Sequence, residues 1–293
     1  MGIVTVDEPL DESAPVARAL AARHCVPDTP GREGCAWYHG FWQYLRLLGL
    51  AKTSGGHIDF LVDSLAIAAR EGSARVLVSG TGDYSMPAHV LAVYGTQRAP
   101  LELHVLDRCA TPVALTRWYA DRANASITGH VADILDFEDP LPYDVIMTNS
   151  FLGYFDLDSR ARLFARWHAL LRPGGMLLLT NRIRPGKGYD AVGFTAAQAS
   201  ALRAAVSREA ERLRGTHACD PQALAALADA YTARFRSVPV RSSNEVVDLA
   251  QAHGFRIRRL DTTAAAGRRQ GDAVSGPTTA EAADYVRLAA VRA

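Results

Sequence analysis

A short glycine-rich segment is the first place in this sequence where the backbone could bind a ligand. The stretch SGTGDYS, residues 79–85, follows the apolar run 76–78 and precedes a segment with helical spacing. Glycines let a backbone approach a ligand closely, and the first amides of a helix are free to bind polar or anionic groups. Gly80 and Gly82 are therefore candidates for contact with an adenine-nucleotide-like cofactor. A tight turn with nothing bound has the same pattern.

Acidic residues at the ends of the next two strand-like segments sharpen this interpretation. Asp107 closes the segment 101–107, 25 residues after Gly82, with Arg108 beside it. A carboxylate in that place can accept hydrogen bonds from both hydroxyls of a ribose, and the alternative is an ordinary solvated loop aspartate. Asp133 could accept a hydrogen bond from an adenine amino group while Ile134 packs on the ring, unless Asp133 is simply a helix N-cap.

These residues depend for their position on an alternation of strand-like and helix-like segments. Apolar or β-branched segments predict strands at 74–80, 101–107, 126–133, 143–150 and 174–182. Helical patterns lie between them at 84–94, 111–124 and 159–171. Such alternation predicts an α/β fold with a doubly wound, mostly parallel sheet. Two last strands, 255–263 and 285–292, have no strong helical pattern between them and are expected to pair antiparallel.

Helical segments flank and interrupt this core. Residues 1–72 are expected to form an N-terminal helical arm and lid, with a loose arm over the first ~15 residues and helices at 15–24, 37–48 and 58–71. Residues 73–293 are expected to form the core. A helical insert at about 190–243 interrupts it, with helices at 195–214 and 221–235, and a further helix covers 244–255.

The strand-end segments resemble those of the class I S-adenosylmethionine-dependent methyltransferases. The matching stretches are VLVSGTGD, HVLD, ADI, YDVIMTNS and LLRPGGMLLL, which cover about 74–182, together with the C-terminal strand pair. The resemblance implies a Rossmann-like sheet of seven strands, S-adenosyl-L-methionine as cofactor and S-adenosylhomocysteine as product. It also implies that Gly80 and Gly82 approach the methionine part, that Asp107 binds the ribose, and that Asp133 and Ile134 contact the adenine.

Two positions depart from the family pattern. Ser79 ends the first strand where the family often has Asp or Glu, so one contact to the cofactor's amino group is in doubt. Asp83 is the candidate substitute for binding the ammonium group, although it could simply cap the next helix. The GxGxxG spacing of dinucleotide enzymes ends here in Ser85, which weakens a nicotinamide interpretation.

The acceptor pocket of the family lies after the fourth strand and under the N-terminal cover. The aromatic segment WYHGFWQY, 37–44, could enclose a flat acceptor and exclude water, although packing against the core would explain it equally well. Candidate catalytic residues are Tyr38, His39 and Tyr154, and Asn149 is a further cofactor candidate. Candidate acceptor-binding residues are Trp37, Trp42, Phe151, Tyr231 and Phe235.

No metal site is expected. His24, Cys25, Cys35 and His39 are residue types that zinc prefers, but the adjacent His24 and Cys25 cannot easily bind one ion, and structural sites favour paired ligands two to four residues apart. A catechol-type magnesium site would need carboxylates after the fourth and fifth strands, where this chain has asparagines.

Composition limits the partners. The 32 Lys and Arg residues and 31 Asp and Glu residues leave a net charge of +1, so no partnership with nucleic acid or with an anionic membrane is expected. Apolar runs are far shorter than the ~20 residues of a membrane span, and the start of the chain lacks a signal-peptide pattern, so a cytoplasmic protein is expected. The aromatic N-terminal helix could also form a homodimer surface.

The expected function is methyl transfer to a small aromatic or heteroaromatic metabolite, at oxygen, nitrogen or carbon. An indole-type ring of secondary metabolism is one example. An NAD(P)-linked oxidoreductase that uses the same glycine turn, and a catalytically silent binding scaffold, are the alternatives.

Overall fold

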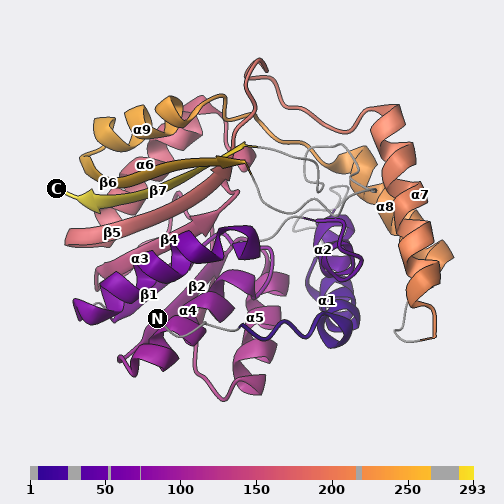
Figure 1. Ribbon diagram of the computed structural model, residues 1–293, viewed down its shortest axis with the longest axis horizontal. Coiled ribbons are helices and arrows are strands. Elements are labelled where there is room, and N and C mark those ends of the chain that lie inside the picture. The colour runs from indigo at the N-terminus through magenta and orange to yellow at the C-terminus, as the bar shows by residue number, and fades with distance from the viewer. Residues whose placement is uncertain (1–5, 26–33, 52–53, 73, 216–219, 265–283) are drawn as a thin grey trace.

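The structure is a computed structural model that describes residues 6–25, 34–51, 54–72, 74–215, 220–264 and 284–293 (Figure 1). The described strands form one seven-stranded sheet in the order β3-β2-β1-β4-β5-β7-β6. The first five strands are parallel, while β7 runs antiparallel to both β5 and β6. The predicted doubly wound sheet with a C-terminal antiparallel pair is confirmed. The strands are β1 (Arg75–Ser79), β2 (Glu102–Asp107), β3 (Thr128–Val131), β4 (Tyr143–Asn149), β5 (Leu171–Arg182), β6 (Phe255–Ala264) and β7 (Asp284–Arg292).

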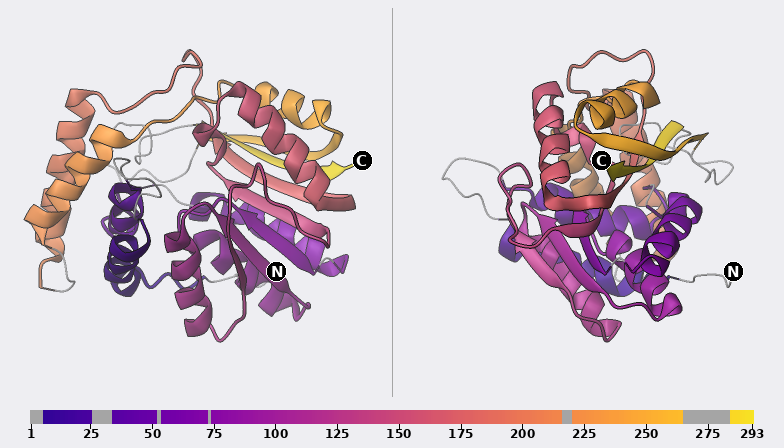
Figure 2. Two further views of the ribbon diagram at one scale, coloured as in Figure 1. Left: turned by 180° about the vertical axis from the view of Figure 1, so that it is seen from behind. Right: turned by 90° about the vertical axis from the view of Figure 1, so that its left-hand side faces the viewer.

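Helices cover both faces of this sheet, as the two views in Figure 2 show. Central strands are buried on both sides, which explains why they read as continuous apolar runs in the sequence. Val76 and Val78 of β1 point into one apolar cluster with α3 and α4, and Leu77 points into another with α6 and α9. The helix α5 packs against β2 and β3. These helices are α3 (Ile58–Arg70), α4 (Ser85–Gln97), α5 (Ala110–Arg122), α6 (Leu157–Leu170) and α9 (Ser243–Ala252).

The remaining long helices form a cap beyond one end of the sheet (Figure 1). They are α1 (Leu10–His24) and α2 (Ala36–Leu47) from the N-terminus, and α7 (Ala196–Leu213) and α8 (Pro221–Arg234) from the insert. Phe41 and Leu45 of α2 pack with Leu202, Leu224 and Tyr231 in an apolar cluster of their own. The predicted lid and the predicted insert are therefore one structural unit. Phe41, Tyr44 and Leu45 of α2 are buried in this unit.

Two expectations for the N-terminal region were wrong. The first helix begins at Leu10 rather than near residue 15, because Ser13 and Ala14 are buried and the Ser13 hydroxyl lies 3.2 Å from the Tyr84 hydroxyl. Tertiary contact outweighs the internal Pro15, a residue type that favours a helix start. The third helix, α3, is not part of the lid either: Phe60 and Leu65 pack on the sheet.

The LRPGG segment lies inside β5 rather than before it. Leu171 pairs with Tyr143, and the register then shifts before Val145 pairs with Met176. Gly174 has φ +75°, and a Cβ on Gly175 would lie 2.9 Å from the Arg172 carbonyl oxygen, so the bulge needs glycines at this point.

Two short 3-10 helices, Ser54–His57 and Leu152–Tyr154, complete the elements of the described residues. Among the described helices, none combines the length and the apolar composition needed to cross a membrane.

Candidate active site

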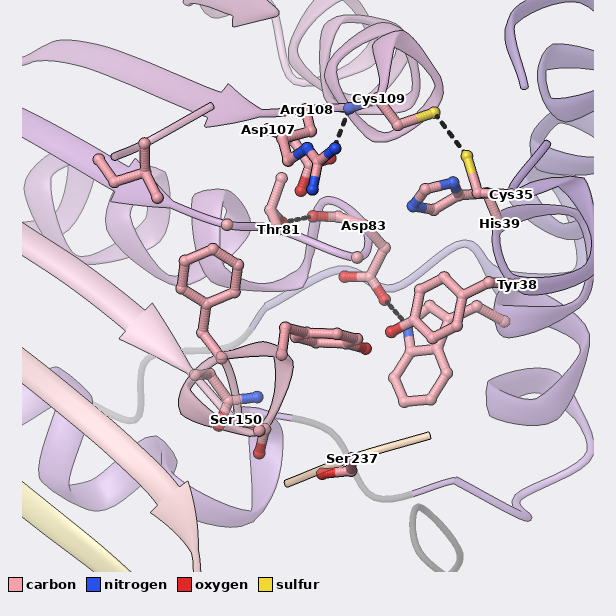
Figure 3. Close-up of a pocket in the computed structure, with 18 of the residues that line it drawn as sticks. Cys35, Tyr38, His39, Thr81, Asp83, Asp107, Arg108, Cys109, Ser150 and Ser237 are labelled. Carbon is pink, nitrogen blue, oxygen red and sulfur yellow. Dashed lines mark hydrogen bonds between the residues drawn. The ribbon is translucent and has the colours of Figure 1, made fainter. Parts of the chain in front are cut away.

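A cavity of about 730 Å³ lies between the sheet and the cap. Its walls come from the segments that follow β1 to β5, from α2, and from the segment 235–240 after α8. The strand order of the sheet reverses between β1 and β4: from β1 the chain continues to β2 on one side, and from β4 it continues to β5 on the other. Open α/β sheets bind ligands beside such a reversal. Figure 3 shows the side chains that face this space.

The glycine turn forms one wall of the cavity. Gly80 has φ +70°, a conformation that side chains rarely adopt, and a Cβ there would overlap the ring of Phe151. The Gly80 amide donates a 2.9 Å hydrogen bond to the Leu106 carbonyl, which ties the turn to the end of β2. A Cβ on Gly82 would lie 3.3 Å from the Tyr38 hydroxyl. Both glycines line the cavity, and the missing side chain at Gly80 makes room for the Phe151 ring.

Asp107 lies at the end of β2 and also lines the cavity. Its Oδ1 accepts a 2.8 Å hydrogen bond from the Cys109 amide. Burial raises the pKa of this carboxyl to about 6, although the charge of His39 and the amides of Cys109 and Thr81 act in the opposite direction. A carboxylate held in a poorly solvated place gains from further donors, such as the two hydroxyls of a ribose.

The turn after β3 contributes an apolar and an acidic group. Ile134 is almost fully buried and lines the cavity beside Asp133. Asp133 Oδ1 accepts from the Leu135 amide at 3.0 Å, and Oδ2 lies 3.5 Å from Nε of the exposed Arg108. Asp133 therefore caps a turn and borders the cavity; no helix follows it among the described residues before β4, so the helix N-cap interpretation is wrong.

Ser79 does not line the cavity, contrary to its assignment as a cofactor-binding residue. Its side chain is fully buried, and its hydroxyl accepts a 3.0 Å hydrogen bond from Trp167 Nε1 on α6. The buried indole N–H needs an acceptor, and Ser79 supplies it. Ser79 therefore serves the packing of α6 on the sheet.

Asp83 lines the cavity and anchors the cap to the glycine turn. Its Oδ2 accepts from Trp42 Nε1 at 2.7 Å and lies 3.0 Å from a nitrogen of Arg46, and its Oδ1 accepts from the Ser85 amide at 2.6 Å. Arg46 is buried and also pairs with Glu8. Two carboxylates thus surround one guanidinium, and of these three groups with a net charge of −1 only Asp83 lines the cavity.

The opposite end of the cavity is aromatic. Tyr38 and Trp42 stack with ring centroids 5.7 Å apart, and Tyr154 meets Tyr38 edge to face at 6.4 Å. Trp37, Phe151 and Phe235 also line the cavity. Tyr231 is fully buried behind Tyr38, 6.0 Å from it, and supports the wall rather than forming it. Its predicted direct contact with an acceptor is therefore not present in the structure.

The two tyrosine hydroxyls in this half are weak acids. Burial raises the pKa of Tyr38 well above its ordinary value, and the nearby phenols of Tyr154 and Tyr231 act in the same direction. The Tyr154 side chain is about half exposed and lines the cavity, and burial of its hydroxyl raises its pKa to about 12. Both phenols stay protonated near neutral pH, so they can donate hydrogen bonds but cannot act as bases.

His39 and Asn149 line the cavity but already have partners in the protein. Burial opposes a charge on His39, yet hydrogen bonds with Cys109 and Cys35 raise its pKa to about 10. His39 Nδ1 lies 3.5 Å from Cys25 Sγ, so the ring faces a group of thiols. The amide oxygen of Asn149 accepts from the Thr180 hydroxyl at 2.6 Å.

Several wall residues were not predicted. Ser150 follows β4 with φ +52°, and Ser237, Val238 and Pro239 also line the cavity; Ser150 and Ser237 are labelled in Figure 3. Nothing in the sequence marks the segment 237–239, because it is held at the cavity by residues far from it in the chain, among them Gly153 and the buried Arg160. Arg182 and Arg184 line the cavity too, and their place at the end of β5 was a usable signal.

Arg160 of α6 holds this wall together. Its side chain is fully buried and donates to the carbonyls of Leu152, Val238 and Pro239 at 3.1, 2.8 and 3.2 Å. It also pairs with Glu245 of α9 at 2.6 Å. One side chain therefore joins the turn after β4 to the segment that leaves the cap.

The chain's sequence matches no protein-family model and no curated protein. Its fold is similar to that of solved structures. The magnesium protoporphyrin IX methyltransferase of Synechocystis PCC 6803, with bound SAM, aligns over all of both chains with a TM-score of 0.50 and 12% identity. The methyltransferase SibL in its apo form aligns over 97% of this chain and 70% of its own, with a TM-score of 0.50 and 16% identity.

An O-methyltransferase family protein from Burkholderia thailandensis has a TM-score of 0.51 and 14% identity, over 87% of this chain and 60% of its own. Together with the strand order, these structures establish that the chain has the fold of class I S-adenosylmethionine-dependent methyltransferases.

Proposed function

We propose that the chain transfers the methyl group of S-adenosyl-L-methionine to a small aromatic or heteroaromatic acceptor. The observation that carries the proposal is one cavity with two unlike halves. Gly80, Gly82 and Asp107 form a polar half with an open backbone, and rings such as Tyr38 and Phe151 form the other half.

The polar half fits the cofactor group by group. Asp107 would accept from the ribose hydroxyls, and Ile134 with Asp133 would border the adenine. The backbone at Gly80 and Gly82, which lines the cavity, would pass along the methionine part. The net negative charge of Glu8, Arg46 and Asp83 would favour its ammonium group. When bound, S-adenosyl-L-methionine supplies an already activated methyl group.

The protein's main task is then to orient the acceptor and keep water out. A flat ring can lie among Tyr38, Trp42 and Phe151, because aromatic faces and edges offer favourable contacts at low entropic cost. The protonated hydroxyls of Tyr38 and Tyr154 can donate hydrogen bonds that fix the ring in its plane. Attack by oxygen, nitrogen or a nucleophilic carbon suits such a pocket, an indole-type ring included.

A dinucleotide-dependent oxidoreductase is the weaker candidate. The dinucleotide fold has an all-parallel order 3-2-1-4-5-6, whereas the last strand here inserts antiparallel between β5 and β6. Ser85 also replaces the third glycine of the dinucleotide turn, and it is buried in the first turn of α4.

Tyr154 gives a direct test of the acceptor half. We expect Tyr154→Ala to lower kcat/KM for methyl transfer about tenfold, because a ring contact and a hydroxyl donor are lost. Affinity for S-adenosylhomocysteine should change less than about threefold, since the polar half is intact. Transfer of labelled methyl from the cofactor to a panel of phenols, indoles and aromatic amines measures the first quantity, and calorimetry the second.

Tyr189→Ala is the matched control, because Tyr189 is a similarly exposed tyrosine outside the cavity. It should leave both quantities unchanged. If wild-type protein binds S-adenosylhomocysteine but labels no acceptor in the panel or in a cell extract, the binding scaffold becomes the better interpretation. Equal turnover by Tyr154→Ala and wild type would contradict the proposed acceptor half.

A further inference from the structure

Three cysteines and one histidine from distant parts of the chain meet at the junction of cap and core. Cys25 follows α1, Cys35 immediately precedes α2, and His39 lies one turn into α2. Cys109 immediately precedes α5, 84 residues after Cys25. Figure 3 shows Cys35, His39 and Cys109 beside the cavity. This set differs from the one that the sequence suggests, since Cys109 takes the place of His24.

The four possible ligand atoms are arranged as a metal site requires. They all lie within 4.8 Å of one another. Cys25 Sγ lies 3.5 Å from Cys109 Sγ and 3.5 Å from His39 Nδ1, and Cys35 Sγ lies 3.5 Å from Cys109 Sγ. With metal–sulfur distances of about 2.3 Å, sulfur atoms at the corners of a tetrahedron are roughly 3.7 Å apart. The observed spacing therefore needs only small adjustments around an ion.

Neither a disulfide nor simple packing of thiols accounts for the cluster as well as a metal ion does. A disulfide needs sulfur atoms at about 2.05 Å and would leave the third thiol and the histidine without a role. Without an ion, Cys25 would bond to the Thr111 hydroxyl, 3.1 Å away, while Cys35 and Cys109 would have mainly the other thiols and His39 as partners. Cys35, the N-cap of α2, and His39 in its first turn are four residues apart, a spacing that lets two side chains bind one ion.

A second group among the described residues lacks these features. His104, His130 and Asp139 also lie close together. Arg75 donates to Asp139 at 3.0 Å and approaches His104 at 3.4 Å, so a positive charge already occupies that place. A cation there would be repelled.

We propose that Cys25, Cys35, His39 and Cys109 bind one zinc ion in a structural site. Three thiolates and one imidazole complete a tetrahedron, which leaves no open position for a substrate. The ion would fix the end of α1 and the start of α2 to the start of α5. Asp107 is two residues before Cys109, so the same link would hold the ribose-binding end of the cavity against the cap. His39 would then be a ligand and not a general base.

Metal analysis of the intact protein tests this inference independently of the proposed reaction. We expect protein purified without chelator to contain about one zinc ion per chain by plasma mass spectrometry. Cobalt exchanged into the wild-type protein should give the charge-transfer and visible bands of a tetrahedral thiolate site. Cys109→Ser should lower the zinc content to below about a tenth of the wild-type value.

His24→Ala and His130→Ala are the matched controls, since they remove the neighbouring histidine and the alternative group. Both should keep the full zinc content. Because Cys109→Ser could disturb folding, the cobalt spectrum of the wild-type protein carries the test without any substitution. Zinc-free protein that takes up neither added zinc nor cobalt, a disulfide between any two of these cysteines, or full zinc content in Cys109→Ser would each overturn the inference.

Discussion

Replacing Asp107 with alanine is expected to weaken the binding of S-adenosylhomocysteine about 10- to 150-fold. This range corresponds to the roughly 1.5–3 kcal/mol that hydrogen bonds to a charged group contribute, at 1.4 kcal/mol per factor of ten. The effect is large because both ribose hydroxyls would lose a charged acceptor. The affinity of Asp107→Asn should fall between those of the wild type and Asp107→Ala, since an amide oxygen can still accept a hydrogen bond.

Isothermal titration calorimetry of the two variants and the wild type measures this effect. Asp136→Ala is the matched control: its carboxylate follows β3 in the next loop and its side chain is 80% exposed. Its affinity should equal that of the wild type. Wild-type affinity in Asp107→Ala, with the fold intact by circular dichroism, would refute the ribose contact.

Replacing Arg160 with methionine is expected to lower the free energy of unfolding by about 3–5 kcal/mol. Methionine occupies a similar space but leaves Glu245 without its 2.6 Å partner and three carbonyls without a donor. Since those carbonyls belong to Leu152 and to 238–239, the acceptor wall should loosen together with the fold.

Urea denaturation followed by tryptophan fluorescence measures the loss. Arg162→Met is the matched control on the same helix, because its side chain is 63% exposed and its nearest carboxylate is 3.8 Å away. Its unfolding free energy should change by less than about 0.5 kcal/mol. A similar small change in Arg160→Met would show that the buried network does not hold the wall.

Most of the fold could be predicted because its signals are local. Strands such as 101–107 are short apolar runs that end in a polar residue, and helices such as α9 have both a cap and a clear apolar face. The start of α1 could not be predicted, for a physical reason. A proline at position 15 suggests a helix start, but burial of Ser13 and its contact with Tyr84 extend the helix backward.

The residues of the polar half of the cavity could be predicted for the same reason. Gly80, Gly82 and Asp107 lie in one βα unit and the next strand, so spacing alone places them together. The cluster of Cys25, Cys35, His39 and Cys109 could not be predicted from the sequence, because Cys25 and Cys109 are 84 residues apart and meet only when the cap packs on α5. Nothing in the sequence around Ser79 indicates its hydrogen bond with Trp167, because the two residues are 88 positions apart. Contacts that depend on such docking cannot be inferred from spacing.

The most direct test of the central claim is a calorimetric titration of the wild-type protein with S-adenosylhomocysteine and, separately, with NAD⁺. We expect saturable binding of S-adenosylhomocysteine, because the glycine turn, Asp107 and Ile134 line the cavity together. We expect no measurable heat from NAD⁺ at the same concentrations. Binding of NAD⁺ without binding of S-adenosylhomocysteine would contradict the proposed methyltransferase.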